Sequence, residues 1–308
     1  APGDRVLVGV HGFFGERLAD LARRCGGVVT RVEAPWGQPL PIDEMVAAIR
    51  RERPAVVACV HAETSTGVLQ PVEEIAAAAR EAGALMLLDT VTSLGGVEVR
   101  VDAWGIAAAY SGVQKCIGCP SGLAPVTFSP AAIAKRQARP DPFPSFYFDV
   151  ALLAQYWGQE RTYHHTAPAN MLFALHEALQ MIEEEGLAAR FTRHRRNARA
   201  LRAGLQAMGL RLFANERYWL PSLTTVWIPD GVDDAAARQA LLREWNLEIG
   251  GGLGPVRGRI WRIGLMGHAS HPANVFYALT AIRSVLRSAG VEVGDGLAAA
   301  AAALAERD

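Results

Sequence analysis

Short apolar segments that alternate with helical patterns constrain the fold of this chain more than any other feature. Between these segments, apolar residues recur at helical spacing, as in residues 12–22 and 72–82. Uninterrupted apolar strands that alternate with helices are typical of a parallel sheet covered by helices on both faces. The first half of the chain is therefore predicted to be an α/β fold with a mainly parallel sheet, whose strands are residues 6–10, 55–60, 85–88 and 106–110.

The pattern changes near residue 167. From there, apolar residues at helical spacing lead to an acidic run and Gly186, which is typical of the end of a helix. We therefore expect a large domain over residues 1–185 and a smaller C-terminal α/β domain over residues 186–308. The smaller domain is predicted to contain helices over 187–208, 235–245 and 274–288, strands over 224–228 and 259–265, and an Ala-rich tail over 297–304 that is helical by propensity.

Charge and composition exclude several classes of function. The 308 residues include 31 Lys+Arg and 31 Asp+Glu, so no net field attracts nucleic acid or an anionic membrane. No apolar run approaches the roughly 20 residues that span a bilayer. Four cysteines do not make a disulfide framework, which favours a reducing compartment. We expect a cytoplasmic enzyme that binds neither nucleic acid nor membrane.

Polar clusters follow three of the apolar strands directly. They are residues 61–67 (HAETSTG), 89–93 (DTVTS) and 111–115 (SGVQK). In an open parallel sheet the carboxyl ends of the strands meet at one edge, where ligands bind. Asp89, Lys115 and several hydroxyl groups are therefore predicted to form one site.

An acid and a lysine at one site suit an aldehyde cofactor that contains a pyridine ring. A lysine in a protected pocket forms a Schiff base with an aldehyde. A carboxylate that faces the pyridine nitrogen keeps it protonated, and the ring then acts as an electron sink. From the residues alone, a surface ion pair between Asp89 and Lys115 is the alternative, with the hydroxyl groups as helix caps.

The order and spacing of these clusters resemble the class V aminotransferases, in particular the alanine–glyoxylate and serine–glyoxylate aminotransferases. The likeness covers nearly the whole chain, and the combination is more specific than any single motif. It implies a pyridoxal-phosphate-dependent transferase of fold type I. The segments that carry the resemblance are residues 63–71, 87–96, 110–115, 163–166, 252–254 and 261–267.

The resemblance implies a role for each residue of the three clusters. Lys115 is expected to bond covalently to pyridoxal 5′-phosphate, and Asp89 to pair with its pyridinium nitrogen. Thr64 is expected beside the phenolic oxygen of the cofactor. Val91 is expected against the face of the ring, and Gln114 on the phosphate.

Residues from later in the chain are expected to complete the site. The resemblance implies that Tyr163 and Thr166 reach the phosphate of the neighbouring subunit's cofactor, which predicts a homodimer with shared active sites. Arg262 is expected to bind the substrate carboxylate. In a strand Arg262 and Ile260 share one face, and Trp261 points to the other. An arginine in an apolar strand is costly without an anion, and its fork suits a carboxylate; a structural ion pair is the alternative.

The implied reaction is transamination from a small amino acid, alanine or serine, to glyoxylate, which gives glycine and a 2-oxo acid. The amine of Lys115 is then the general base at Cα, and two half-reactions on one site predict ping-pong kinetics. The sequence does not distinguish the amino donors.

Two other functions are open. Cysteine desulfurases are similar, but they usually carry His-Lys where this chain has Gln114-Lys115, and Cys116 is fixed beside the lysine. The other is a chain that cannot catalyse. Class V members carry a Ser/Gly-rich phosphate loop ahead of the point that matches Ala1, and we expect this N-terminal part of the large domain to be absent.

Further signals are interpreted as structural. The glycines of residues 9–15 lack the spacing of a dinucleotide fingerprint and are expected to pack a strand against a helix. Residues 250–254 lack the lysine of a P-loop and are predicted to be a mobile active-site loop near Arg262. Cys116 and Cys119 are expected to be packing residues, because no second pair completes a metal site. The six arginines of residues 190–202 are predicted to form a solvated helical face.

Overall fold

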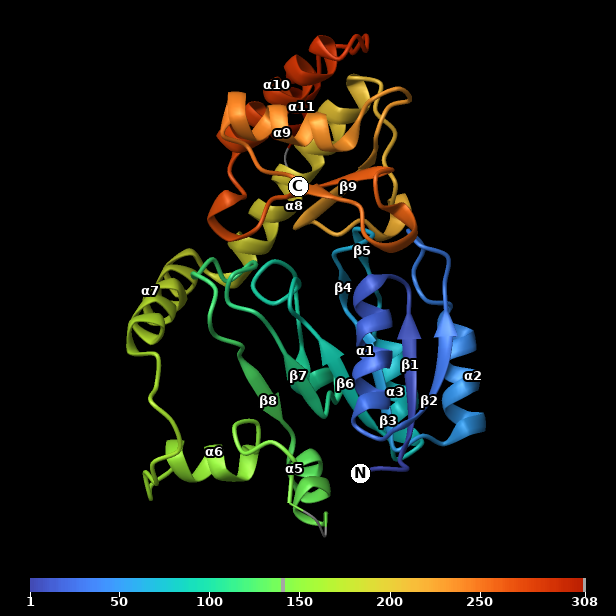
Figure 1. Ribbon diagram of the computed structural model, residues 1–308, viewed down its shortest axis with the longest axis vertical. Coiled ribbons are helices and arrows are strands. Elements are labelled where there is room, and N and C mark those ends of the chain that lie inside the picture. Colours follow the sequence, from blue (N-terminus) through green and yellow to red (C-terminus); the bar gives the residue numbers. More distant parts are fainter. Residues whose placement is uncertain (140–141, 307–308) are drawn as a thin grey trace.

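The computed structural model describes residues 1–139 and 142–306, and its larger sheet confirms the predicted α/β fold. Six strands lie in the order β2-β1-β3-β6-β7-β8 (Figure 1). All neighbours are parallel except β7 and β8. The bounds are β1 Arg5–Val10, β2 Val28–Glu33, β3 Val56–Val60, β6 Leu85–Asp89, β7 Ala108–Tyr110 and β8 Val126–Phe128.

Helices cover the β1–β3 half of this sheet on both faces. Leu7 of β1 packs in a core with α2 (Ile42–Glu52) and α3 (Glu73–Glu81). Its neighbour Val8 packs on the other face, in a core with α1 (Phe13–Arg24). Successive residues of a strand point to opposite faces, so the two cores are separate layers.

The β6–β7 half departs from the prediction of helices on both faces. Ala58, Leu87 and Tyr110 line a cavity of about 390 Å³ beside α1. The physical reason is the connection that follows β7, which runs to the antiparallel strand β8 instead of to a crossover helix. The chain then continues through α5 (Pro130–Gln137), α6 (Val150–Trp157) and α7 (Ala169–Glu185), away from this face (Figure 1).

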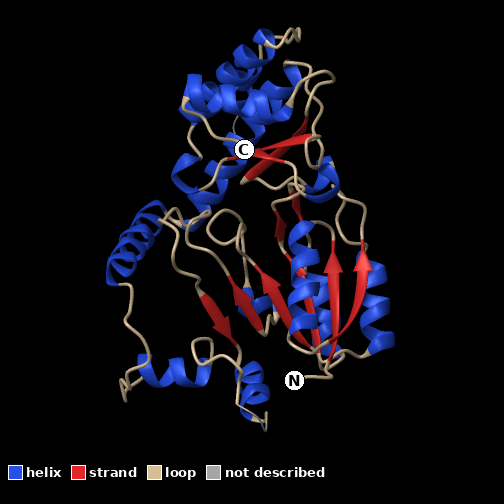
Figure 2. Cartoon of the chain, in the orientation of Figure 1, coloured by secondary structure: helices blue, strands red, loops and turns tan. Residues whose placement is uncertain are grey.

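The C-terminal part builds a second, antiparallel sheet in the order β10-β11-β9 (Figure 2). Trp261 and Ile263 of β11 lie in its core, whereas Arg262 faces away, as the strand register predicted. The bounds are α8 Leu187–Ala207, β9 Leu223–Trp227, α9 Asp234–Trp245, β10 Gly250–Gly251, β11 Ile260–Gly264, α10 Pro272–Ser288 and α11 Leu297–Ala305. The short elements are β4 Ala62–Glu63, β5 Val68–Leu69, α4 Val101–Trp104 and the 3-10 turns Glu216–Tyr218, Gly254–Val256 and Gly267–Ala269.

Part of the predicted glycine loop is a strand. Gly250 and Gly251 pair with Arg262 and Trp261 as β10. A Cβ on Gly250 would lie 3.1 Å from Nη2 of Arg262. The arginine side chain therefore lies closely against this strand, and a larger residue at Gly250 would push on it.

The Ala-rich tail is a packed helix. α11 lies along α8 and buries Ala300 and Leu304. Arg196 of α8 donates two hydrogen bonds to the Leu304 carbonyl, at 2.9 and 2.6 Å. A helix end leaves carbonyls without intrahelical partners, and this guanidinium satisfies one of them.

The prediction of a solvated arginine face on α8 is correct for Arg195 and Arg196, which are exposed, but wrong for the two arginines that are buried. Arg190 and Arg202 are 1% and 8% exposed. Arg202 donates to the Leu220 carbonyl at 2.5 Å, and Arg190 donates to the Gly95 carbonyl at 3.0 Å. The reason is that α8 lies against α10, α11 and loops of the larger sheet. The guanidinium groups of Arg190 and Arg202 therefore meet backbone carbonyls instead of water.

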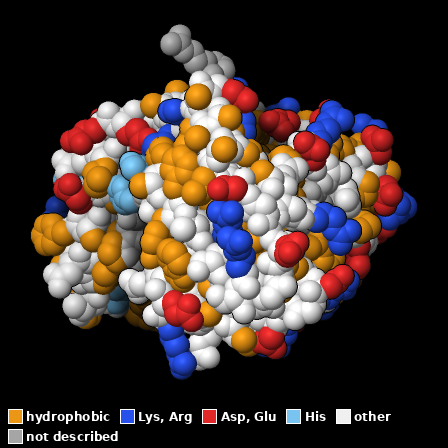
Figure 3. Space-filling view, turned by 90° about the horizontal axis from the view of Figure 1, so that it is seen from above, with side chains coloured by type: hydrophobic (Ala, Val, Ile, Leu, Met, Phe, Trp, Pro, Cys, Tyr) orange, Lys and Arg blue, Asp and Glu red, His pale blue; other side chains and the backbone are white. Residues whose placement is uncertain are grey.

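Acidic and basic side chains are interspersed on the face of the molecule in Figure 3, where neither sign forms a continuous patch. This agrees with the balanced charge of the sequence. Among the described residues, no helix has both the length and the apolar character needed to cross a membrane.

Candidate active site

The three polar clusters of the sequence lie at one edge of the larger sheet. β3, β6 and β7 are adjacent and parallel, and each cluster begins where one of these strands ends. A cavity of about 360 Å³ opens beside this edge. It brings five of the eight predicted site residues together: Thr64, Asp89, Val91, Gln114 and Lys115.

Asp89 presents a buried carboxylate to this cavity. Its Oδ1 accepts a hydrogen bond from the Val91 N–H at 2.9 Å, and its Oδ2 accepts one from the Tyr110 hydroxyl at 2.7 Å. Burial raises the pKa of Asp89, and these two hydrogen bonds oppose that shift. A cation placed against Oδ1 or Oδ2 would favour the ionised form.

Lys115 reaches the same cavity from the loop after β7. The loop turns sharply, since the Gly118 N–H donates to the Lys115 carbonyl at 3.0 Å. The side chain of Lys115 is half-buried and that of Gln114 is exposed. Lys115 and Asp89 therefore line one cavity instead of forming the surface ion pair that the residues alone left open.

The cavity lining also includes Phe14 and Arg17 of α1 and Tyr110 of β7, which were not predicted as site residues. The Arg17 guanidinium lies 5.0 Å from the centre of the Phe14 ring, and its charge, like the two hydrogen bonds, opposes the rise that burial causes in the pKa of Asp89. Burial raises the pKa of Tyr110, which keeps its hydroxyl a donor to Asp89. Two consecutive aromatic residues at the start of a helix that follows a strand were the signal for Phe14.

Glu63 fixes the start of α1 at this edge. Its buried Oε2 accepts from the N–H groups of Phe14 and Gly15, both at 3.1 Å. Its Oε1 accepts from the Ser65 hydroxyl at 2.6 Å, and the Ser65 Oγ accepts from the Phe13 N–H at 2.9 Å. The N-terminus of α1 is therefore occupied by a carboxylate and a hydroxyl of the 61–67 cluster.

The first glycine run packs α1 closely against β1, as predicted. A Cβ on Gly15 would lie 3.0 Å from the Cα of Val10. A Cβ on Gly12 would lie 2.4 Å from Glu63. Both glycines serve the approach of helix to strand that places Phe14 at the cavity.

Arg262 reaches the large-sheet loops from the small sheet. Its Nη1 donates to the Thr64 carbonyl at 3.3 Å, and its Nε donates to the Gly251 carbonyl at 2.7 Å. No carboxylate among residues 1–139 and 142–306 lies within ion-pair distance of Arg262. Because Thr64 lines the cavity, the Arg262 guanidinium lies at the rim of the cavity, where it is half-buried. Its two hydrogen bonds use only part of its five N–H donors.

Tyr163 and Thr166 lie apart from this cavity. They belong to the segment between α6 and α7, and their hydroxyl oxygens are 3.2 Å apart. Tyr163 is 74% exposed. Their expected role at a neighbouring subunit's cofactor stays a prediction.

Cys116 and Cys119 are buried packing residues. Cys116 donates to the Thr92 carbonyl at 3.2 Å, and burial raises the pKa of its thiol to about 11. Within the described part of the chain, no group of three or more histidine, cysteine or acidic residues is arranged to hold a metal ion.

Comparison with known proteins decides the family of this site. Residues 1–256 match the family model of the class V aminotransferases. The chain belongs to this family. Membership makes it an aminotransferase that uses pyridoxal 5′-phosphate.

Several relatives extend the similarity along the chain. The chain is 40% identical to the (S)-ureidoglycine–glyoxylate transaminase of Bacillus subtilis, over 97% of this chain and 77% of that protein. The crystal structure of that Bacillus subtilis enzyme superposes with a TM-score of 0.97 over 99% of this chain and 79% of that chain. An alanine–glyoxylate aminotransferase from Nostoc sp. is 50% identical, with a TM-score of 0.91 over 93% of this chain and 76% of that chain. The curated alanine–glyoxylate aminotransferase of Drosophila melanogaster is 37% identical, over 93% of this chain and 74% of that protein.

The residues of the cavity fit a pyridoxal group. A volume of about 360 Å³ suits a small molecule. Asp89 supplies a buried carboxylate for a pyridinium nitrogen, and Lys115 supplies the one amine of the cavity lining for an aldehyde. Phe14 and Val91 add apolar surface for an aromatic ring.

Proposed function

We propose that this enzyme transfers an amino group from a small amino acid to glyoxylate, giving glycine and a 2-oxo acid. The observation that carries the proposal is the cavity that holds Lys115 and Asp89 with Arg262 at its rim. The names of the Bacillus subtilis, Nostoc and Drosophila relatives all include glyoxylate as a substrate, which supports it as the amino acceptor.

We propose the following roles for the cavity residues. Bound pyridoxal phosphate supplies an electron sink at the amino-acid Cα. The Lys115 amine would hold the aldehyde group of the cofactor and, once displaced by substrate, would take the proton from the amino-acid Cα and deliver it to the aldehyde carbon of the cofactor. Asp89 keeps the ring nitrogen protonated. Thr64 orients the phenolic oxygen, Val91 packs on the ring and Gln114 binds the phosphate.

The proposed partner of Arg262 is the substrate carboxylate. Its position on β11 keeps the guanidinium at the rim, and its bonds to two backbone carbonyls leave further N–H donors for an anion. A carboxylate held there places the Cα of an amino acid toward the cavity. All α-amino acids share this group, so Arg262 selects the class and not the side chain.

We propose alanine or serine as the amino donor, and a donor panel tests this choice. Glycine formed from glyoxylate would be measured with alanine, serine, aspartate and (S)-ureidoglycine, the last being the substrate named for the Bacillus subtilis relative. Faster turnover with alanine or serine supports the proposal. Activity with (S)-ureidoglycine alone would mean that this compound, and not alanine or serine, is the amino donor. If no donor gives glycine, glyoxylate transamination is refuted.

A cysteine desulfurase is the weaker alternative. It requires a mobile, ionised cysteine, but Cys116 is buried with a thiol pKa raised to about 11. The other three cysteines lie outside the lining of the cavity or, like Cys59 and Cys119, are buried. Release of sulfur from cysteine, added to the donor panel as a fifth amino acid, would revive this function.

We propose a homodimer in which Tyr163 and Thr166 reach the partner's cofactor. The part of the chain from residue 146 to residue 173, which includes them, is rich in exposed aromatic side chains, and such side chains bury well in interfaces. These are Phe146, Tyr147, Phe148, Trp157, Tyr163 and Phe173.

We also propose that residues 1–185 and 186–308 are the large and small domains. Each part has its own sheet and hydrophobic core, and Gly186 separates α7 from α8 with a positive φ of 77°. A location in the cytoplasm stays a prediction from the cysteine content.

A further inference from the structure

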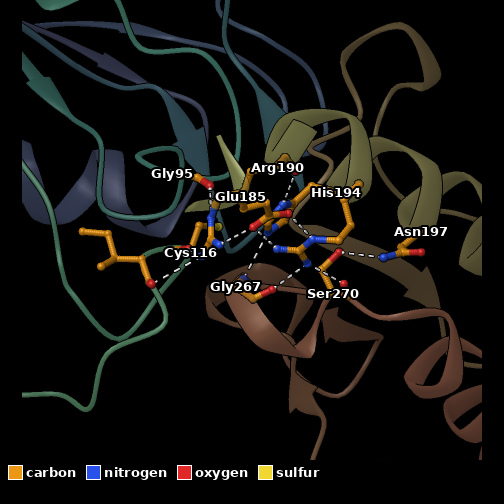
Figure 4. A network of polar contacts seen from close by, with 10 residues as sticks. Gly95, Cys116, Glu185, Arg190, His194, Asn197, Gly267 and Ser270 are labelled. Carbon is orange, nitrogen blue, oxygen red and sulfur yellow. Dashed lines mark hydrogen bonds and ion pairs between the residues drawn. The ribbon is translucent and has the colours of Figure 1, made fainter. Parts of the chain in front are cut away.

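Arg190 of α8 is hydrogen-bonded to the loop that carries Lys115. Its Nη2 donates to the carbonyl of Cys116, the next residue after Lys115, at 2.7 Å. Its Nε donates to the Gly95 carbonyl at 3.0 Å, in the loop that follows Asp89 (Figure 4). A fully buried guanidinium thus spans the two loops that carry the proposed cofactor ligands.

The next turn of α8 is bonded to the loop that follows Arg262. Arg193 Nη1 donates to the carbonyls of Gly267 and Ser270, at 2.9 and 2.5 Å. His194 Nε2 accepts from the Gly267 N–H at 3.1 Å, while its Nδ1 lies 2.8 Å from the Arg190 carbonyl. Since a carbonyl only accepts, Nδ1 carries the proton, and His194 is held as one neutral tautomer.

Glu185 joins the two arginines. Its Oε2 accepts from Arg190 Nη1 at 2.7 Å, and its Oε1 accepts from Arg193 Nε at 2.5 Å (Figure 4). Arg193 and then Arg190 lower the pKa of Glu185 to about 2, so the carboxylate stays ionised. The Glu185 carboxylate therefore orients the Arg190 guanidinium toward the Lys115 loop. It also orients the Arg193 guanidinium toward the loop after Arg262.

The two loops also touch directly. A Cβ on Gly267 would lie 3.0 Å from the Cα of Gly118 and 3.3 Å from the Cys116 carbonyl. Gly267 has a positive φ of 57°, which other residues rarely adopt. Backbone therefore meets backbone here, and Arg190 and Arg193 are hydrogen-bonded to the two sides of this contact, at Cys116 and Gly267.

We propose that Glu185, Arg190 and Arg193 are positioning residues that fix the distance between the amine of Lys115 and the guanidinium of Arg262. The inference rests on the proposed roles of those two groups. Proton transfer at Cα requires the lysine within hydrogen-bond reach while the carboxylate stays on the arginine. A displacement of about 1 Å between such groups costs on the order of 10²-fold in rate.

The test compares Arg190→Met with Arg195→Gln. Methionine keeps an unbranched chain but has no donors, whereas Arg195 is an exposed arginine of the same helix, bonded to Thr192. Turnover is divided by the number of sites in which borohydride fixes cofactor to Lys115. We expect Arg190→Met to lower kcat per loaded site at least tenfold with KM for the donor changed less than about threefold, and Arg195→Gln to match the parent.

A merely structural role predicts another result. Arg190→Met would then lower Tm and the number of loaded sites, but kcat per loaded site would equal that of the parent, and this outcome overturns the proposal. If Arg190→Met does not fold, Arg193→Gln replaces it, because Arg193 is only partly buried and its loss leaves the bonds of Arg190 to the Lys115 loop. The same fall in kcat per loaded site is expected.

A second readout does not depend on activity. Amide hydrogen exchange is measured at Gly118 and Cys119 in the Lys115 loop, whose N–H groups are bonded within that loop. Arg193→Gln is expected to lower their protection although Arg193 does not touch them, and unchanged protection contradicts the coupling. Glycine formation from glyoxylate by the parent separately tests the proposed function, so the two failures are distinguishable.

Discussion

At the scale of single residues, the environment of Asp89 explains why this carboxylate suits a cofactor. It is buried at the end of β6, and its two protein hydrogen bonds come from an N–H and a neutral hydroxyl. Burial raises its pKa, so the ionised form lacks a full counter-charge in the protein alone. A pyridinium nitrogen would supply that charge.

Asp89→Asn is expected to lower kcat by about 10²- to 10³-fold, because the amide has no charge to keep the ring nitrogen protonated. Steady-state kinetics with glyoxylate measures the effect. The control is Asp102→Asn, which removes an exposed carboxylate of α4. A kcat within threefold of the parent would show that Asp89 does not act on the cofactor.

At this scale, site residues could be predicted from the sequence only where they lie at or just after the end of a predicted strand. Asp89 and Lys115 could be placed at one edge because each belongs to a polar cluster at the end of a strand of a parallel sheet, and the resemblance implies their roles. Phe14 and Tyr110 were missed because their place in the cavity depends on how α1 and β7 approach β6. Arg190 was misread, since helical periodicity does not tell which polar face meets water and which meets carbonyl groups.

At the scale of elements, α8 and α11 show how tertiary packing overrides propensity. Gly204 lies where α8 meets the start of α11, and a Cβ there would lie 2.3 Å from Leu279 Cδ1 and 3.1 Å from the Gly296 carbonyl. In an isolated helix, glycine to alanine stabilises by roughly 1 kcal/mol. The packing and the propensity therefore predict opposite signs for one substitution.

Gly204→Ala is expected to destabilise the protein by about 1–3 kcal/mol, the usual cost of overpacking. Urea unfolding followed by circular dichroism gives the free energy. Ala203→Gly, at the adjacent position of α8, is the comparison and should cost about 1 kcal/mol by propensity, in addition to the lost contact of its methyl group with the core. Stabilisation by Gly204→Ala would mean that Leu279 of α10 and the Gly296 carbonyl do not crowd α8 at this point.

Elements with strong periodicity were predictable nearly to the residue. The predicted helix over 187–208 is α8 Leu187–Ala207, and the tail over 297–304 is α11 Leu297–Ala305. β2 (Val28–Glu33) and β8 (Val126–Phe128) were not predicted. β2 is an edge strand that mixes valines with polar residues, and β8 has three exposed residues, so neither carries the apolar run of a central strand.

At the scale of the whole molecule, buried neutral histidines make stability depend on pH. Burial lowers the pKa of His11 to about 3 and of His61 and His194 to about 4, against an unfolded value near 6.5. The unfolded chain therefore binds more protons below pH 6.5. Their contribution to stability is complete above pH 6.5 and is lost as the pH falls toward 4.

His11→Asn is expected to reduce the pH dependence of the unfolding free energy between pH 6.5 and 4.5 by up to about 1.4 kcal/mol per pH unit, the value for one proton. Neither ring nitrogen of His11 has a hydrogen-bond partner among the described residues, so burial alone lowers the pKa of this side chain. Urea titrations at several pH values measure the slope. The exposed His176 of α7 provides the control, His176→Gln, and an equal slope in both variants would contradict the assignment to His11.

Subunit complementation tests whether the active site is shared between two chains. Lys115→Ala and the pair Tyr163→Ala/Thr166→Ala are each expected to inactivate the proposed homodimer. If Tyr163 and Thr166 act on the partner's cofactor, each mixed dimer has one intact site, and refolding an equal mixture restores about a quarter of the parent activity. If they act within their own chain, the mixture stays inactive.

The covalent attachment of the cofactor tests the account most directly. The chain contains two lysines, Lys115 in the cavity and Lys135 on α5, where it pairs with Asp4 at 3.0 Å. The protein would be incubated with pyridoxal 5′-phosphate, reduced with borohydride, digested and analysed by mass spectrometry. We predict one pyridoxyl group per chain, on Lys115, and its loss in Lys115→Ala; labelling of Lys135 instead, or of neither lysine, would contradict the proposed active site.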